Sequence, residues 1–298
     1  MFKNLTVYRI GPDWSFDLKI IEQALYKTRF VECGATQPSS SGWVPPRGTA
    51  HAPLLETVAG HLLLKLMVEQ KVLPGAVVKR RTDEIAKQIE DTTGRKPGKK
   101  QTKEIKEQAV LDLLPMAFTK QSSMNVWIDP MQRLLMIDAS SQTKADEVAG
   151  LLVKAFEGFA VQHLQTTQSA SVAMSEWLLS GEPPAAFSVD RECELKSTDE
   201  MKSVVRYSRH TLDTDEVRQH ISSGKVPTKL ALTWQSRVSV LLTDTMQVKK
   251  ISFLDVVFEG RTAHKDEAFD ADAAIATGEL SKLIPDLVDA LGGELLKN

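Results

Sequence analysis

Residues 224–244, GKVPTKLALTWQSRVSVLLTD, predict a turn, a strand, a second turn-like region and the start of a second strand. Lys225, Lys229 and Arg237 interrupt an otherwise apolar run. Nothing in the stretch has the pattern of a catalytic site. Strand hairpins of this kind dominate over alternating β-α-β units along the chain, so we predict an α+β protein with helices and mixed or antiparallel sheets.

The composition is that of an ordinary globular protein. The chain has 298 residues, of which 42% are hydrophobic and 26% are charged, and its formal net charge is −2. A wholly basic surface is therefore excluded, and a nucleic-acid site would require local segregation of charge. No apolar run approaches the ~20 residues of a membrane span, and the first residues lack the features of a secretory signal. With only Cys33 and Cys193 present, we expect a cytoplasmic protein with no membrane partner.

The first part of the chain is expected to form an α+β body. Strands are predicted at residues 5–10 and 62–68, and a helix is predicted between them at residues 16–26. Residues 37–47 are rich in Ser, Gly and Pro, so we predict that they form a loop.

The strongly charged stretch from residue 77 to residue 114 differs from its surroundings. Apolar residues recur there at helical spacing in two narrow stripes, and residues 94–101, GRKPGKKQ, separate the stripes. The pattern predicts a projecting helical hairpin with too few apolar residues to form a core of its own. We therefore divide the chain into a central body of residues 1–74 and 121–180, a helical tip of residues 75–120, and a C-terminal base domain of residues 181–298.

Helix boundaries in the second half of the chain are predicted from local signals. Thr143 and Asp146 have the spacing of a capping box, and so do Asp213 and Glu216. Pro285 lies inside the apolar pattern of the C-terminal helix and indicates either a kink or a late start of that helix.

The sequence contains no strong motif for catalysis, a cofactor or a metal. It has no Gly-x-Gly-x-x-Gly, its histidines lack the short spacing of a zinc site, and no nucleophile motif is present. Asp270, Asp272 and Glu279 could gather magnesium in a nuclease, but charge at a helix N-terminus and solvation explain them better. We therefore predict no catalytic residue, no cofactor and no metal site.

A first basic cluster lies between residues 79 and 106. Ten basic residues face five acidic ones there, which leaves a surplus of five positive charges. Lysine ammonium groups bind phosphate as point charges without reading bases. A solvated helical hairpin with salt bridges explains the same pattern, so charge alone leaves both interpretations open. The basic residues are Lys79, Arg80, Arg81, Lys87, Arg95, Lys96, Lys99, Lys100, Lys103 and Lys106.

A second basic cluster comprises Arg206, Arg209, His210, Lys225 and Lys229. Strand alternation would place Arg206 and Arg209 on opposite faces, whereas Lys225 and Lys229 share a face if their strand is regular. A surface sheet edge protected by lysine is an equally good account of these residues.

Phe118 follows Pro115 and precedes Lys120. Core packing is the simplest explanation of this phenylalanine. If its side chain is exposed among polar residues, it indicates a contact between protomers instead.

Several segments have a distinctive sequence, order and spacing, and together they extend almost from one end of the chain to the other. They are FKNLTVYRI at 2–10, GWVPPRG at 42–48, LLPMAFTKQ at 113–121, WIDPMQRLLMIDASS at 127–141, GKVPTKLAL at 224–232 and FDADAAIATGELSKLIPDLVDALGGE at 269–294. Together they closely resemble the RdgC family of bacterial recombination-associated proteins. The resemblance implies a DNA-binding protein rather than an enzyme.

The resemblance also implies an assembly and a mechanism. Proteins of this family form homodimeric rings in which a positively charged central hole encloses single- or double-stranded DNA with little sequence preference. They restrain strand exchange driven by RecA because they compete with it for DNA. Each protomer has a central body, a helical tip and a base domain, which agrees with the division proposed above.

Single positions can be carried over from the family. Phe118 matches a phenylalanine at the contact that closes the ring, while Arg209 and His210 fall where the family has a basic residue and a polar neighbour near DNA. Met116 stands where relatives can have arginine, so we hypothesise that one phosphate contact is missing. His210 replaces an amide, so we hypothesise that binding strengthens as pH falls. The residues predicted to contact DNA are Arg206, Arg209, His210, Lys225, Lys229, Lys120, Lys79, Arg80, Lys99 and Lys100.

Three functions remain open at the level of sequence. The favoured one is a non-specific, nucleoid-associated DNA-binding dimer that modulates recombination. The second is a metal-dependent nuclease, which magnesium-dependent loss of intact DNA would reveal. The third is a scaffold whose basic tip binds an acidic protein, and partner binding that ignores DNA and survives nuclease treatment would favour it.

Overall fold

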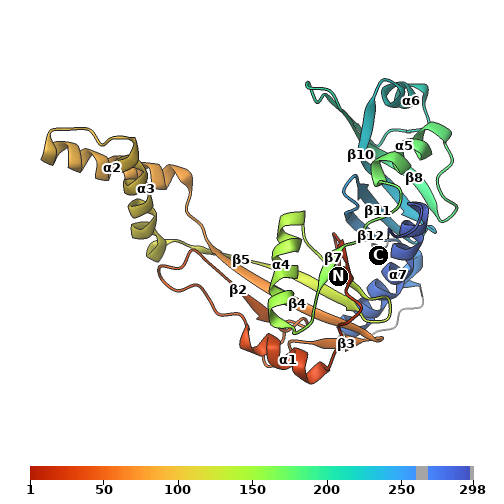
Figure 1. Cartoon of the computed structure of the whole chain (residues 1–298), viewed down its shortest axis with the longest axis horizontal. Coiled ribbons are helices and arrows are strands. Elements are labelled where there is room, and N and C mark those ends of the chain that lie inside the picture. Colours follow the sequence, from red (N-terminus) through yellow and green to blue (C-terminus); the bar gives the residue numbers. More distant parts are fainter. Residues whose placement is uncertain (260–267, 296–298) are drawn as a thin grey trace. The chain divides into compact units, whose positions relative to one another are not determined.

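The structure is a computed structural model that describes residues 1–259 and 268–295, and it confirms an α+β fold with two antiparallel sheets (Figure 1). The α-helices of the described part are α1 (Leu18–Lys27), α2 (Gly75–Thr93), α3 (Lys99–Leu113), α4 (Gln142–Ala155), α5 (Ala170–Ser180), α6 (Asp215–Ser222) and α7 (Ala268–Ala290). Short 3-10 helices lie at Leu114–Met116 and Asp255–Phe258. None of the helices in this part is long and apolar enough to cross a membrane.

The first sheet has the strand order β2-β4-β5-β6-β1-β7, and β3 pairs with β4 beside this path. All the pairings with a defined register are antiparallel. The strands are β1 (Thr6–Ile10), β2 (Ser39–Val44), β3 (Glu56–Val58), β4 (His61–Lys71), β5 (Thr119–Asp129), β6 (Leu134–Ile137) and β7 (Val161–His163).

The second sheet has the order β12-β11-β10-β8-β9, and all of its pairings are antiparallel. Its strands are β8 (Phe187–Ser197), β9 (Val204–Ser208), β10 (Lys225–Trp234), β11 (Val238–Thr243) and β12 (Val248–Phe253). The stretch at residues 224–244 therefore forms the predicted strand pair, with β10 and β11 joined by a tight turn in which Gln235 and Ser236 have positive φ.

The chain divides into two compact units. One unit consists of Met1–Ile21, Leu55–Leu64 and Asn125–Asn298, and it contains the whole second sheet. The other consists of Glu22–Leu54 and Lys65–Met124, and it contains α2 and α3.

The core of the first unit lies on one face of the second sheet. Leu195, Leu230, Leu232 and Trp234 are fully or almost fully buried there, together with apolar residues of α5 and α7. Burial of such side chains stabilises the fold by about 1.5–3 kcal/mol each relative to exposure. The indole N–H of Trp234 donates to Asp286 of α7 at 2.7 Å, so the polar end of this buried ring is satisfied.

Helix α7 continues through Pro285, so the expectation of a late helix start at this residue is wrong. Proline has no N–H for the carbonyl group of Ser281, four residues earlier, which leaves that carbonyl without its helical donor. The side-chain amide of Gln132, from the turn between β5 and β6, donates to this carbonyl oxygen at 2.9 Å. A side chain from another element therefore replaces the missing backbone donor.

The predicted helical hairpin is present in the second unit, where α2 and α3 cross and pack against each other (Figure 1). Gly94 ends α2 in the left-handed conformation, with φ 71°, and its N–H donates to Glu90. Glycine adopts this conformation without steric cost, which explains a sharp helix end here. Arg81 of α2 and Asp112 of α3 form an ion pair at 3.0 Å that joins the two helices.

Three local predictions are wrong. Residues 37–47 do not form a loop throughout, because β2 pairs with β4 over Ser39–Val44. Helix α4 is capped by Ser141 rather than Thr143, since the Ser141 hydroxyl accepts from the N–H of Lys144. Thr214 likewise caps α6, while Asp213 instead forms an ion pair with Arg218. In both helices a neighbouring hydroxyl residue takes the capping position.

Candidate nucleic-acid interface

Side-chain alternation along the second sheet separates an apolar face from a charged face. On β8 and β9, Leu195 and Tyr207 are buried in the core, whereas Glu194 and Arg206 lie on the opposite face. Lys229 of β10 pairs in register with Glu194, and Arg206 of β9 pairs with it from the other side. Side chains that are opposite each other across strands point to the same face, so three strands bring these charges together.

Glu194 lies at the centre of this charged cluster. Its Oε2 accepts from Nε of Arg206 at 2.6 Å, and its Oε1 accepts from Nζ of Lys229 at 3.0 Å and from the Thr228 hydroxyl at 2.9 Å. Burial alone would raise the pKa of Glu194, but these hydrogen bonds outweigh it and lower the pKa to about 2. The carboxylate is therefore ionised throughout the physiological pH range.

The same face carries a second ion pair. Nζ of Lys250, on β12, donates to both oxygens of Glu192 at 2.6 and 2.9 Å. Lys196 follows Glu194 by two residues on β8 and so lies on this face as well. The face therefore mixes cations with carboxylates, and its positive charge is partly neutralised from within.

Lys225 and Lys229 do not share a face, which corrects the expectation for a regular strand. The pairing of β10 with β8 shifts register between Pro227 and Lys229. Before the shift, Lys225 pairs with Ser197, which by alternation along β8 points to the same face as the buried Leu195. After the shift, Lys229 pairs with Glu194, which points to the opposite face. One extra residue in a strand reverses the face of the sheet to which the later side chains of that strand point. Lys225 and Lys229 therefore point to opposite sides of the sheet.

Arg209 and His210 lie beyond the end of β9 and are exposed. Arg209 adopts a left-handed backbone conformation with φ 56°, which ends the strand and its alternation. Nδ1 of His210 donates to the carbonyl oxygen of Thr211 at 2.6 Å, and the His210 N–H donates to Arg191. Through its backbone carbonyl group, Arg191, which is also exposed, therefore lies next to His210.

The turn between α2 and α3, taken together with the first residues of α3 up to Lys103, is the most basic part of the helical hairpin. No acidic residue occurs between Asp91 and Glu104, and the basic residues in this interval are all exposed. Lys96 is close to Glu90 at 4.0 Å, a distance at which an exposed pair stabilises little. The basic residues are Arg95, Lys96, Lys99, Lys100 and Lys103.

Elsewhere on α2, Lys79 and Arg80 are exposed in the first turns of the helix. Arg80 lies 3.8 Å from Glu84, whereas Arg81 is held by Asp112 and Glu84. The sequence-predicted cations of the hairpin are therefore not equivalent, since Arg81 joins the two helices while Lys99 and Lys100 lie at the turn.

Phe118 is exposed, so the core-packing explanation of this residue is wrong. The residue is 86% exposed, and Met116 is 75% exposed. The backbone is nevertheless held, because the N–H of Val72 donates to the carbonyl oxygen of Phe118 at 2.8 Å. Lys120 follows on β5 and is exposed. A fixed backbone that presents two large apolar side chains to solvent is typical of a contact surface.

The carboxylates considered for a nuclease do not converge. Asp270, Asp272 and Glu279 all belong to α7, and its rise separates Asp270 from Glu279 by about 13 Å along the axis. Glu279 also accepts two hydrogen bonds from Arg237, at 2.7 and 2.6 Å. Within the residues that the structure describes, no three His, Cys, Asp or Glu side chains are grouped to hold a metal ion.

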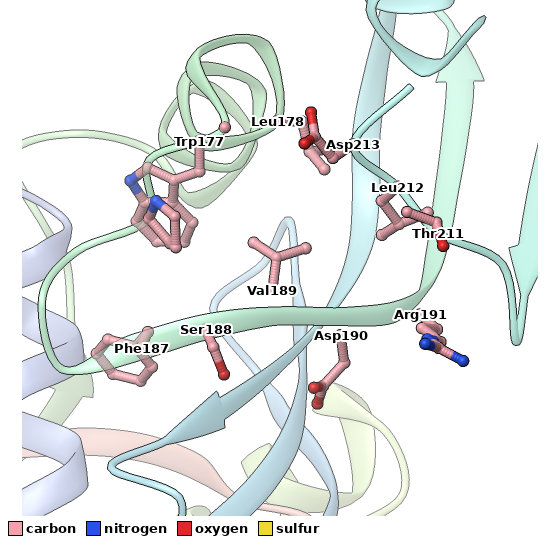
Figure 2. A pocket seen from close by; sticks show the side chains of 12 residues that line it. Trp177, Leu178, Phe187, Ser188, Val189, Asp190, Arg191, Thr211, Leu212 and Asp213 are labelled. Carbon is pink, nitrogen blue, oxygen red and sulfur yellow. The ribbon is translucent and has the colours of Figure 1, made fainter. Parts of the chain in front are cut away.

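A pocket of about 360 Å³ lies between α5, β8 and residues 211–213. Val189 points from β8 toward α5, whereas Ser188 and Asp190 lie on the other side of the strand (Figure 2). Trp177 and Phe187 contribute aromatic walls, but both are largely buried. Apolar and charged residues line the pocket together, and none of the sequence-predicted DNA contacts is among them.

Sequence reasoning missed Glu194, Glu192 and Lys250 as parts of the charged face. Their signal lies in strand pairing, because Glu194 becomes significant only when β9 and β10 place Arg206 and Lys229 beside it. The alternation of β8 alone identifies Glu194 as a solvent-side residue but not its partners.

Comparison with known proteins identifies close relatives over nearly the whole chain. The family profile described as "RdgC: Putative exonuclease, RdgC" matches residues 1–294. "Recombination-associated protein RdgC" of Cupriavidus necator is 46% identical over 296 residues, which is 98% of each chain. The proteins with the same description in Dechloromonas aromatica and a Janthinobacterium species are 42% and 43% identical, over 99% of each chain.

The Arg237–Glu279 pair predicts a pH-dependent contribution to stability. The hydrogen bonds from Arg237 lower the pKa of Glu279 against the opposing effect of burial. A lowered folded-state pKa gives stability that is present above about pH 4.3, the unfolded value, and is lost as pH falls through the folded value. Urea denaturation should show Glu279→Gln destabilised by about 2 kcal/mol at pH 7, with a smaller difference below pH 4.

The matched control is Glu147→Gln, an exposed glutamate of α4. Its unfolding free energy should stay within about 0.5 kcal/mol of the wild-type value. A Glu279→Gln protein that is as stable as the wild type at pH 7, or a difference that grows on acidification, would contradict this account of the pair.

Proposed function

The chain belongs to the RdgC family, and from this premise we propose that it binds DNA without sequence preference and acts in recombination. The family relationship extends over 98–99% of these relatives, so it includes both compact units of the fold. We propose that the protein is cytoplasmic and nucleoid-associated. Both single- and double-stranded DNA are its ligands, because phosphates are common to both.

The observation that carries this proposal is the basic turn between α2 and α3. Five exposed cations lie there without an intervening acidic residue, although the chain as a whole has a net charge of −2. Four of the five are lysines, which bind phosphate through a compact charge and do not fix a particular base. Segregated positive charge of this kind supports binding to a polyanion.

The charged face of the second sheet supplies a second group of phosphate contacts in this proposal. Arg206 and Lys229 contribute from that face, while Arg209 and His210 contribute from the end of β9. Lys225 acts from the other side of the sheet, and Lys79, Arg80 and Lys120 from the second unit. None of these contacts requires a side chain to enter a DNA groove.

We further propose that two copies form a ring around DNA and that Phe118 lies at the contact that closes it. An exposed Phe118 on a held backbone, with Met116 nearby in sequence, supports a contact between protomers. A ring with a basic lining is compatible with a net charge of −2, because its outer surface can be acidic. By occupying DNA, such a ring competes with RecA and restrains strand exchange.

We propose binding rather than hydrolysis, although the description of the family profile names an exonuclease. The carboxylates that could serve a nuclease are spread along α7, and Arg237 occupies both oxygens of Glu279. The cations at the hairpin turn, in contrast, are exposed and suited to phosphate.

Charge reversal at the hairpin turn should weaken DNA binding. A Lys99→Glu, Lys100→Glu double variant is expected to lose about tenfold or more in affinity for a labelled random-sequence duplex in fluorescence anisotropy. If each lysine neutralises one phosphate, the log–log salt dependence should become shallower by about 1.8. The matched control, Lys87→Glu, reverses a charge on α2 between Asp83 and Asp91 and should change affinity much less. Equal losses in both proteins would refute a site at the turn.

Truncation at the proposed ring contact should loosen the hold on DNA that has no ends. Phe118→Ala is expected to lower affinity for closed circular DNA about tenfold, while affinity for short linear duplex changes little, because local phosphate contacts remain. Met131→Ala serves as the control, since Met131 is 91% exposed in another part of the chain. Full affinity of Phe118→Ala for closed circular DNA would disprove the role of Phe118.

A further inference from the structure

We propose that Glu194 is a built-in competitor of the DNA backbone, whose carboxylate holds Arg206 and Lys229 until a phosphate group displaces it. This inference rests on the proposed DNA-binding function and adds a regulator of affinity to that site. It assigns a role to an acidic residue at the centre of a basic cluster, where a carboxylate opposes polyanion binding.

The geometry gives Glu194 control over both cations. It lies on β8, the strand between β9 and β10, and register places Arg206 and Lys229 directly opposite it on either side. One carboxylate oxygen accepts from Arg206 at 2.6 Å, and the other accepts from Lys229 at 3.0 Å. A single carboxylate therefore binds both cations at once.

The exposure of the side chains indicates that Arg206 and Lys229 can exchange the Glu194 carboxylate for an anion from solvent. The Arg206 side chain is 73% exposed and that of Lys229 is 40% exposed, whereas that of Glu194 is only 15% exposed. The two cationic side chains are thus accessible to solvent, whereas the carboxylate is covered and lies closer to the sheet. An approaching phosphate can meet them from the solvent side without moving any backbone element.

Carboxylate and phosphate are alternative partners for the same donors. A guanidinium or ammonium group forms charge-assisted hydrogen bonds with either anion. With Glu194 in place, a phosphate meets a cluster with one net positive charge, since two cations are opposed by one carboxylate. Removal of the carboxylate charge leaves two, so the affinity of the cluster for phosphate should rise.

The competition is independent of physiological pH. The pKa of Glu194 is about 2, because hydrogen bonds from its partners outweigh the effect of burial. Protonation therefore does not release Arg206 and Lys229 near neutrality, and the polyanion itself must do so. The gain from removing the carboxylate should accordingly be the same at pH 6 and at pH 8.

Glu192 provides a matched control on the same strand and the same face. It binds Lys250 through both oxygens and has no hydrogen bond with Arg206 or Lys229 among the interactions of the described residues. Glu192→Gln removes the same charge two residues away and leaves the Glu194 cluster intact. Comparison of the two variants separates release of Arg206 and Lys229 from a general change in net charge.

The test measures affinity for a labelled random-sequence duplex by fluorescence anisotropy across salt concentrations, with the full chain. Glu194→Gln should bind about fivefold more tightly than wild type, which corresponds to about 1 kcal/mol, with a steeper salt dependence. Glu192→Gln should change affinity by less than about twofold. If Glu194→Gln fails to fold, Glu194→Ala is the alternative variant. It removes the carboxylate without adding an amide donor, and it should also bind more tightly than wild type.

A double-mutant cycle identifies the cause of the gain. In an Arg206→Ala, Lys229→Ala background, Glu194→Gln should no longer increase affinity, because the cations that it releases are absent. Unchanged or weaker binding by Glu194→Gln, or a gain that persists in this background, would overturn the inference. Failure of the wild type to bind DNA would refute the proposed function itself, whereas wild-type binding without a gain in Glu194→Gln would refute only the competition.

Discussion

The alternation of side chains across the second sheet is the constraint on which the rest of the account depends. Leu195 and Tyr207 must enter the core for the sheet to pack, and this places Glu194 and Arg206 on the opposite face. Pairing then adds Lys229 to the same face. The charged cluster is thus a direct consequence of how the sheet buries its apolar side chains.

Charge in this protein is organised in two different ways. At the turn between α2 and α3, cations are gathered without carboxylates between Asp91 and Glu104, so positive charge is directed to solvent. On the charged face of the second sheet, Arg206 and Lys229 are paired with Glu194, and Lys250 is paired with Glu192. The first arrangement favours attraction of a polyanion, and in our proposal Glu194 limits how tightly Arg206 and Lys229 hold one.

Much of the fold follows from the sequence, and the exceptions have identifiable causes. The helical hairpin and the β10–β11 pair were predictable because helical and strand periodicities are local properties. Strand β2 was not, because its Ser and Gly residues have the composition of a loop; Gly42 is required because a Cβ there would lie 2.4 Å from Phe30 Cα. That constraint arises from a distant backbone segment.

The candidate site shows the same limit. Exposure of Lys99 and Lys100 was predictable from a charged turn, but the opposite orientations of Lys225 and Lys229 depend on a register shift against β8. The exposure of Phe118 also required the structure, since an apolar residue after Pro115 is equally compatible with a core. Local sequence identifies which residues can bind phosphate, and strand pairing decides where they point.

The most direct test of the central claim is the salt dependence of wild-type binding to labelled duplexes of unrelated sequence. If cations hold the phosphate backbone, affinity should fall linearly on a log–log plot with a slope of about −0.9 per phosphate neutralised. The slope and the affinity should be the same for every sequence. Absence of binding at low salt, or affinity that depends strongly on sequence and weakly on salt, would contradict the account.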